Sequence, residues 1–330
     1  MLQLKNATPF AAEIAVFPNE KGIDTLYSIV KATFLLQNAW VLADEQAPPQ
    51  KEDEYWGEPG LSSIKVASDF HIGKSSTDIV MIGAACAPNQ TPVHSLDVQL
   101  NVGQVNKTVR VTGDRVWMDG RVSAPKPFTS MPIVYEKAFG GRHQITEDQY
   151  MAEEKNPVGC SFKGKQSSSD LNKTPLPNIE DPSDPIQYIG DSPNPAGFGF
   201  CSPDWLPRRM YAGTYDENWQ KNRAPYLPAD FDRKFLNAAH PDLIYPGYLQ
   251  GGEPLFISNM HPDGEIRAQL PQVSIKCDIN LKGSTHSPQM NLETLILEPN
   301  QRQLAMVWRS EFECDKQVLD INEVVLKLTR

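Results

Sequence analysis

The sequence has no apolar run long enough to cross a bilayer and no closely spaced pair of cysteines. Its longest apolar stretch, residues 79–87, contains Gly83 and has the length of a strand, whereas a membrane span needs about 20 apolar residues. The five cysteines lie far apart, at positions 86, 160, 201, 277 and 314. An odd number without a Cys-x-x-Cys pair fits neither a disulfide framework nor a zinc knuckle. We expect buried free thiols and no membrane insertion.

The first residues of the sequence show no pattern of a signal peptide, and the chain has no excess of basic charge. Residues 1–6 show no charged start followed by an apolar stretch, so we expect a cytoplasmic protein. The 31 Lys and Arg residues face 41 Asp and Glu residues, which gives a formal net charge of -10. Sequence-independent binding of nucleic acid needs clustered Lys and Arg against the phosphates. We therefore expect no nucleic-acid partner.

Familiar catalytic motifs are missing as well. The sequence contains no Gly-x-Ser-x-Gly, no His-Glu-x-x-His, no phosphate loop and no Gly-x-Gly-x-x-Gly. Its six histidines are scattered, and none lies three or four residues from another, so the spacing predicts no metal site. The 330 residues, 40% of them hydrophobic, are ample for a sizeable core. We predict a protein that is not an enzyme and holds no cofactor or metal.

What the chain does contain is a succession of β-rich segments. Residues 25–36 are rich in β-branched and aromatic side chains, and residues 96–112 alternate around a short turn as in a hairpin. Similar segments return from residue 254 onward. The only predicted helices are short, at 148–155 and 230–239. The sequence therefore predicts a mainly β protein, with a sandwich- or barrel-like antiparallel β body and few short helices.

A long proline- and glycine-rich region interrupts these strands. Sixteen of the 28 prolines lie between residues 156 and 271. Proline fixes φ and glycine permits positive φ, so such a composition specifies the path of a loop. Aromatic residues within it indicate ordered loops, because disordered linkers are poor in aromatics. We predict a single β-rich domain over 1–330 with a loop-rich insertion at about 140–250. The alternative is two packed β units, 1–140 and 250–330, joined by that region.

One cluster of charged residues has both a structural and a catalytic interpretation. Asp69 and Asp78 flank a short stretch that also contains His71 and Lys74. In the structural interpretation, both carboxylates accept backbone N–H bonds and Lys74 pairs with one of them. In the catalytic interpretation, paired carboxylates of a hydrolase act on a glycan or a peptide, with Asp216 as a third candidate. We favour the structural interpretation, because no nucleophile or oxyanion donor is evident beside the cluster.

A second cluster follows Gly113. In the structural interpretation Asp114 forms a turn, Arg115 pairs with a buried carboxylate and Trp117 fills the core. In the functional interpretation Arg115 and Trp117 are anchors of a protein interface, where both residue types are enriched. Residues 115 and 117 share one face of a strand, so both interpretations are geometrically allowed. We favour the structural one.

Aromatic residues and arginines also gather in and beside the loop-rich insertion. Such side chains supply contact area at a low cost in conformational entropy. The candidate partner-binding residues are Phe139, Arg142, Trp205, Arg208, Tyr215 and Trp219. The alternative for each of them is that the side chain fastens its own loop. We predict that a partner protein binds to this region.

Short phrases distributed through the chain also match one family pattern when taken in order. They are VKATF at 30–34, GDRVW at 113–117, MPIVYEKAFGG at 131–141, NPVG at 156–159, LPNIE at 176–180, PAGFG at 195–199 and GTYD at 213–216. Together they resemble the bacterial domain-of-unknown-function family two-one-six-nine, which is encoded in type VI secretion gene clusters. The phrase ETLILEP at 293–299 departs mildly from the Asp-Thr-Leu expected there.

The resemblance implies a non-catalytic adaptor or chaperone. Its expected partner is an effector with a PAAR-like tip domain, which it helps to load onto the type VI secretion spike, and the spike protein is a second candidate partner. The resemblance supplies no catalytic residues. Two alternatives from other classes stay open, namely the carboxylate-dependent hydrolase and a structural component of the secretion apparatus.

Overall fold

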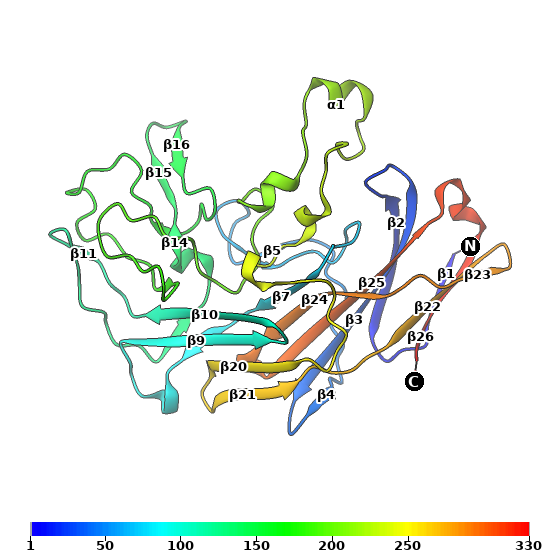
Figure 1. The fold of residues 1–330 in the computed structure, drawn as a ribbon, viewed down its shortest axis with the longest axis horizontal. Coiled ribbons are helices and arrows are strands. Elements are labelled where there is room, and N and C mark those ends of the chain that lie inside the picture. The colour runs from blue at the N-terminus through cyan, green and yellow to red at the C-terminus, as the bar shows by residue number, and fades with distance from the viewer. Residues whose placement is uncertain (1, 330) are drawn as a thin grey trace.

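The computed structural model describes residues 2–329, and Met1 and Arg330 lie outside the described residues. A sheet of seven strands forms the centre of the molecule (Figure 1). Its order is β19 (Ile244–Tyr245), β7 (Thr77–Met81), β24 (Asn291–Glu298), β25 (Gln303–Glu313), β3 (Asp24–Leu36) and β2 (Ala11–Pro18), with β4 (Trp40–Leu42) also paired to β3. The strand predicted at 25–36 is thus the long central strand β3.

The two faces of the central sheet differ in polarity. β3 is buried over ten consecutive residues, 25–34, because other elements cover both of its faces. Val30 lies opposite Trp308 of β25 on one face, and Ile29 lies opposite Arg309 on the other. Lys31 shares the face of Arg309, since side chains alternate along a strand. Two buried cations therefore lie on one face of the sheet and need buried partners there.

Two smaller sheets accompany the central one. A five-stranded sheet has the order β18 (Ile179–Glu180), β10 (Val105–Thr112), β9 (Ser95–Val102), β20 (Pro254–His261) and β21 (Gly264–Gln269). A four-stranded sheet has the order β1 (Gln3–Asn6), β26 (Ile321–Leu328), β22 (Ile275–Leu281) and β23 (Ser284–His286). The four-stranded sheet packs against β3, where the Cys277 thiol donates to Ser28 Oγ at 3.5 Å.

Short elements complete the fold. The strand pairs are β5 (Glu54–Tyr55) with β6 (Ile64–Val66), β8 (Ala84–Cys86) with β13 (Ser130–Pro132), β11 (Trp117–Met118) with β12 (Arg121–Val122), β14 (Phe139–Gly140) with β17 (Cys160–Ser161), and β15 (Arg142–Gln144) with β16 (Tyr150–Ala152). The helices are α1 (Glu217–Asn222) and the 3-10 turns η1 (Pro88–Gln90), η2 (Tyr135–Lys137), η3 (Arg208–Tyr211), η4 (Arg233–Leu236), η5 (Pro241–Leu243), η6 (Pro299–Gln301) and η7 (Asp315–Asp320). We call residues 140–250 the loop region, because most of them lie outside helices and strands.

One hydrophobic core runs through these parts of the chain. Leu26 near the N-terminus, Phe198 of the loop region and Leu304 near the C-terminus belong to the same buried cluster. A smaller cluster under the loops consists of Trp117, Phe139, Leu171, Leu176 and Ile186. Because β3 pairs with β25, the central sheet combines strands from both ends of the chain. A division into units 1–140 and 250–330 would cut through that sheet, so we keep one domain as our interpretation.

The mainly β fold is confirmed, with three corrections to its details. The sheets of the described residues are open, so the barrel alternative does not hold. Three strand pairs are parallel, namely β1 with β26, β7 with β24, and β14 with β17. The helix predicted at 148–155 is wrong, because this segment turns back on β15 and places Met151 opposite His143. Residues 230–239 contain only the short turn η4.

No helix in residues 2–329 has the length and apolar character needed to span a membrane.

Candidate functional site

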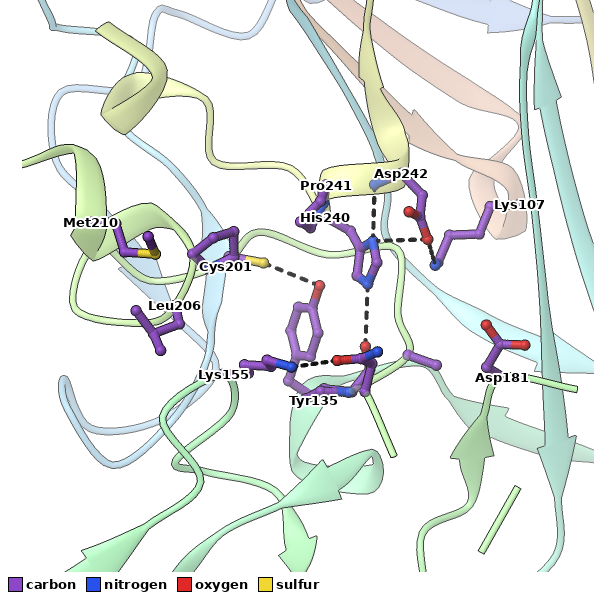
Figure 2. Close-up of a pocket in the computed structure, with 14 residues that line it drawn as sticks. Lys107, Tyr135, Lys155, Asp181, Cys201, Leu206, Met210, His240, Pro241 and Asp242 are labelled. Carbon is purple, nitrogen blue, oxygen red and sulfur yellow. Dashed lines mark hydrogen bonds and ion pairs between the residues drawn. The ribbon is translucent and has the colours of Figure 1, made fainter. Parts of the chain in front are cut away.

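A pocket lies where the loop region meets the five-stranded sheet. It has a volume of about 500 Å³, and Figure 2 shows its side chains converging from separate segments. β10 supplies Lys107, η2 supplies Tyr135, and the turn around η5 supplies His240 and Asp242. The other wall is apolar and consists of Pro195, Ala196, Leu206, Pro207, Met210 and Pro241. We call this cavity the His240 pocket.

His240 fastens the two sides of the pocket together. Its Nδ1 accepts a hydrogen bond from the backbone N–H of Asp242 at 3.2 Å, so Nε2 carries the proton and donates to the carbonyl of Pro195 at 3.2 Å. Burial, reinforced by the nearby charge of Lys107, lowers the pKa of His240 to about 4. The imidazole is therefore neutral at pH 7, which is the form that both hydrogen bonds require.

A pH dependence of stability follows from this imidazole. Its pKa of about 4 in the folded state is below the ordinary value of 6.5, so the unfolded chain takes up the proton first as the pH falls. The stabilisation is complete well above pH 6.5 and is lost as the pH falls toward 4, and the loss relative to high pH is about 2 kcal/mol at pH 5. Urea unfolding of His240→Gln at pH 7 and pH 5 should show a pH-dependent loss about 2 kcal/mol smaller than that of the unchanged chain. The same substitution at the exposed His94 is the control, and equal losses for both variants would contradict the assignment.

An ion pair closes the polar side of the pocket. Lys107 Nζ lies 2.6 Å from Asp242 Oδ2, with the lysine buried and the carboxylate mostly exposed. Partial burial alone would raise the pKa of Asp242, but the hydrogen bond and charge of Lys107 hold it below its usual value. The buried ammonium thus has one protein partner and a water-exposed anion beside it. The pair fixes η5 to β10.

The floor of the pocket is a neutral phenol and a neutral thiol. Tyr135 Oη and Cys201 Sγ lie 3.3 Å apart, and the Tyr135 ring meets Trp205 edge-on at a centroid distance of 5.3 Å. Burial raises the pKa of both Tyr135 and Cys201 above their ordinary values. Neither group is ionised at neutral pH, so the floor offers no thiolate or phenolate for nucleophilic attack. The pocket has the character of a binding site.

A second cavity of about 330 Å³ adjoins the first along Pro207 and Pro241, which line both. Arg208 and Lys234 line it on the basic side. The Arg208 guanidinium donates to the carbonyls of Cys201 and Phe235, each at 2.7 Å. This predicted partner-binding residue therefore connects two loops, and its half-buried side chain leaves only part of its surface for contact.

The other predicted partner-binding residues divide into two groups. Phe139 and Trp205 are each 2% exposed, and their rings fill the core under the loops. A covered side chain cannot reach a partner, so we correct the predicted contact set by removing these two. Arg142 is exposed and stacks over Tyr150 at 5.1 Å. Tyr215 is 54% exposed.

Trp219 lies in α1 (Glu217–Asn222), which is part of a projecting segment (Figure 1), and Tyr215 lies just before this helix. Their rings meet edge-on at 4.7 Å, and the Trp219 indole donates to the carbonyl of Tyr226 at 2.8 Å. Asp216 caps α1 by accepting the backbone N–H of Trp219 at 2.8 Å. Figure 1 shows α1 and the β15–β16 hairpin projecting from the same side of the molecule. Arg142, on that hairpin, and Tyr215 thus belong to the two projections of this side.

The carboxylates of the hydrolase alternative do not line any of these cavities. Asp69 is buried and accepts Lys31 Nζ at 3.0 Å and the Gln50 N–H at 2.7 Å. Asp78 is buried and accepts Lys74 Nζ at 2.7 Å and the Ala238 N–H at 2.8 Å. Asp216 is an exposed helix cap. Both buried carboxylates have the backbone and lysine partners that the structural interpretation requires.

The other charged side chains near Asp69 and Asp78 lie on the same polar face of the central sheet. Arg309 Nε donates to Glu293 Oε2 at 2.8 Å, and its Nη2 donates to the carbonyl of Asp69. Burial lowers the pKa of His71, as do the nearby charges of Arg309 and Lys74. Its Nδ1 accepts the N–H of Gly73 at 3.1 Å. Apart from Arg309 Nη1, which is buried without a hydrogen-bond partner, these groups bond within the protein and join loops to the sheet.

The second cluster is also structural in its contacts. Arg115 Nη2 lies 2.5 Å from Glu180 Oε2, and this carboxylate is buried. Asp114 Oδ1 accepts from the Asn178 amide at 3.2 Å. Trp117 is buried in the smaller hydrophobic cluster. These contacts give neither Arg115 nor Trp117 a free surface for a partner.

The sequence patterns did not predict the residues that line the His240 pocket. One local signal was available, because His-Pro-Asp occurs twice, at 240–242 and at 261–263. In both copies the histidine Nδ1 accepts the N–H of the aspartate, at 3.2 and 3.1 Å. A basic residue pairs with each aspartate, Lys107 in the first and Arg302 in the second. Among residues 2–329, no three His, Cys, Asp or Glu side chains are arranged to hold a metal ion.

Comparison with known proteins identifies the family. Residues 21–309 match the model of a family described as an uncharacterized protein conserved in bacteria (DUF2169), and the chain belongs to this family. No curated protein and no solved structure matches the chain.

Proposed function

We propose that this member of the DUF2169 family is a non-catalytic adaptor. In this proposal it binds an effector with a PAAR-like domain in the cytoplasm of the bacterium that makes it, and assists loading of that effector onto the type VI secretion spike. The observation that carries the proposal is a set of exposed apolar side chains in the loop region, one of which, Met210, lines a preformed pocket. In the loop region these are Ile145, Tyr150, Met151, Tyr188, Met210, Tyr215 and Tyr226.

Met210 is the most informative of these side chains. It lines the His240 pocket and is 71% exposed. A flexible thioether at the mouth of an apolar cavity adapts to partner side chains of different shapes. Exposed apolar residues beside a concave site are typical of protein interaction surfaces. The proposal therefore places the effector over the mouth of the pocket.

The loops support the proposal through their rigidity. Arg208 and His240 fasten the segments around 195, 201, 235 and 242 to one another. Loops that are already ordered lose little conformational entropy when a partner binds, so more of the contact energy appears as affinity. The neutral thiol and phenol on the floor, together with buried and fully partnered carboxylates, favour binding over catalysis.

The test begins with co-expression of this chain and a PAAR-like effector encoded beside it. We expect the two proteins to co-purify, and we expect secretion of the effector to fall when this chain is deleted. An effector that stays soluble and is secreted normally without this chain would overturn the proposal.

Met210→Asp should then weaken binding of the effector by about 30-fold, the effect of losing about 2 kcal/mol at an interface hot spot. The matched control is Leu319→Asp on η7, because Leu319 is also an exposed apolar side chain, 96% exposed, and lies outside the loop region. Titration calorimetry gives both affinities, and thermal melting checks that both variants fold. Equal affinities for the two variants would remove the pocket mouth from the contact surface.

A further inference from the structure

Two strands end their sheets without a neighbour on the outer side. In the described part of the chain, β4 pairs only with β3, and β21 pairs only with β20. An unpaired edge presents a row of backbone N–H and C=O groups that another strand can bind. These two edges belong to different sheets, the central sheet and the five-stranded sheet.

The ladder geometry shows which groups of β4 are free. The backbone bonds from Gln37 to Ala39 and from Ala43 to Thr33 define the hydrogen-bonded pairs beside β3. In an antiparallel ladder, hydrogen-bonded and non-hydrogen-bonded pairs alternate. Trp40 and Leu42 therefore direct their backbone N–H and C=O groups away from β3.

The same argument applies to β21. Leu270 donates its N–H to the carbonyl of Glu253 at 2.9 Å, and Ala268 lies opposite Leu255 two residues further along the ladder. Even-numbered residues of β21 therefore bond to β20. Arg267 and Gln269 direct their backbone groups outward, and no hydrogen bond within residues 2–329 uses those groups.

A groove of about 410 Å³ is shared by these two edges. We call it the edge groove, and its walls include Leu36, Asn38 and Trp40 on one side and Arg267, Gln269 and Leu270 on the other. Two walls that both offer free backbone donors and acceptors are complementary to one kind of occupant, an extended polypeptide. We propose that the edge groove binds an extended segment of a partner protein as an added β-strand.

The side chains of the groove indicate the chemistry of that segment. Trp40 and Leu42 lie opposite Leu36 and Phe34, so their side chains share the core-facing side of the sheet. Leu42, which lies beside the groove on β4, keeps more than a third of its surface exposed. A bound strand would cover this apolar surface with every second side chain. We expect a segment that alternates apolar and polar residues.

The charges beside the groove are already paired. Arg267 binds Glu265 at 2.7 Å and stacks over Phe256 at 4.3 Å. The groove therefore does not require a strongly charged segment, and recognition rests on the backbone and on alternate apolar contacts. This second surface goes beyond the proposed function. Any partner protein that has such a segment fits the edge groove, and not only the effector.

The test uses proline to remove the outward N–H groups. Leu42→Pro with Arg267→Pro deletes one outward donor on each edge and leaves the bonds to β3 and β20 in place, since proline is tolerated on an edge whose N–H faces outward. Arg267 lines the groove, and Leu42 lies two residues from Trp40, which also lines it. Leu42→Ala with Arg267→Ala is the matched control, because it shortens the same side chains and keeps the backbone. The probe is a phage library of random nine-residue peptides, selected on the unchanged chain.

We expect enriched peptides with alternating apolar residues that bind the alanine variant within about threefold of the unchanged chain. The proline variant should bind them at least tenfold more weakly, as expected for the loss of two backbone hydrogen bonds. Fluorescence anisotropy measures both affinities, and thermal melting checks the folding of the variants. Peptides that bind the alanine and proline variants equally would overturn the proposal.

A scan of the peptide itself keeps the test independent of how the variants fold. N-methylation at any central position of an enriched peptide should weaken binding to the unchanged chain, because successive N–H groups of a strand between two edges point alternately to β4 and to β21. Methylation of the terminal positions should not. A scan in which no central position matters, or a library without enriched peptides, contradicts strand addition. A dimer in sedimentation that the proline variant loses would assign the groove to a second copy of this chain and overturn the partner proposal. An effector that binds the proline variant normally would leave the adaptor function standing and remove only the role of the groove.

Discussion

Replacing Asp78 with alanine is expected to lower the free energy of unfolding by about 3–5 kcal/mol. The carboxylate is fully buried and accepts three hydrogen bonds, from Lys74 Nζ, the Asn237 amide and the Ala238 N–H, at 2.7, 2.9 and 2.8 Å. Without it, the buried ammonium of Lys74 keeps Thr294 Oγ1 as its partner and no counter-charge at hydrogen-bond distance. A buried charge whose partner is removed costs far more than a lost surface pair.

Asp97→Ala is the matched control for this prediction. Asp97 pairs with Arg110 at 2.8 Å, but both side chains are more than 40% exposed. We expect its loss to cost no more than about 1 kcal/mol. Urea unfolding at pH 7 measures both variants. If Asp78→Ala unfolds at nearly the urea concentration of Asp97→Ala, the carboxylate does not stabilise the sheet–loop contact.

The same substitution tests how the scaffold positions the candidate site. Asn237 and Ala238, which Asp78 binds, lead directly into the turn that carries His240 and Asp242. Loss of the carboxylate should therefore increase hydrogen exchange of the amides at 237–242 more than that of β24. An equal increase in hydrogen exchange at residues 237–242 and in β24 would mean that the Asp78 carboxylate does not position the His240 pocket.

The sequence predicts those structural features that depend on residues close together in the chain. The β-rich pattern of residues 25–36 corresponds to β3, because alternation and β-branched content act within one strand. The helix predicted at 148–155 is wrong because pairing with β15 outweighs the local preference of a short segment. The parallel pairing of β7 with β24 joins residues about 220 positions apart, and no local pattern encodes it.

The residues of the candidate site are even harder to predict from the sequence, because they lie far apart in the chain. The partners of Asp69 and Asp78 include Lys31 and Ala238, which lie 38 and 160 residues away in the chain. The His240 pocket combines Lys107, Tyr135 and residues after 194. Of these, only the repeated His-Pro-Asp turn carries a signal within a few residues. The exposed anchors were also indistinguishable from buried ones by residue type, because Trp205 and Tyr215 lie in similar loop sequences.

Trp205 and Tyr215 are the pair that separates folding from binding. We expect Trp205→Ala to lower the free energy of unfolding by about 3–5 kcal/mol, the cost of deleting a buried aromatic side chain. Trp205 is 2% exposed, and its ring meets Tyr135 on the floor of the His240 pocket. Tyr215 is 54% exposed, so Tyr215→Ala should cost less than about 1 kcal/mol.

Binding of the PAAR-like effector should follow the opposite order once stability is taken into account. At a temperature where both variants are folded, Tyr215→Ala should weaken binding by tenfold or more if the projecting segment contacts the effector, since exposed tyrosines are frequent hot spots. Trp205→Ala should change the affinity only as far as the pocket floor relaxes. Calorimetric titration gives the affinity of each variant for the effector, and urea unfolding gives the free energy of unfolding of each variant. A Tyr215→Ala variant that binds normally moves the contact surface away from α1 and toward Met210, because Met210 lies on η3 whereas Tyr215 directly precedes the cap of α1.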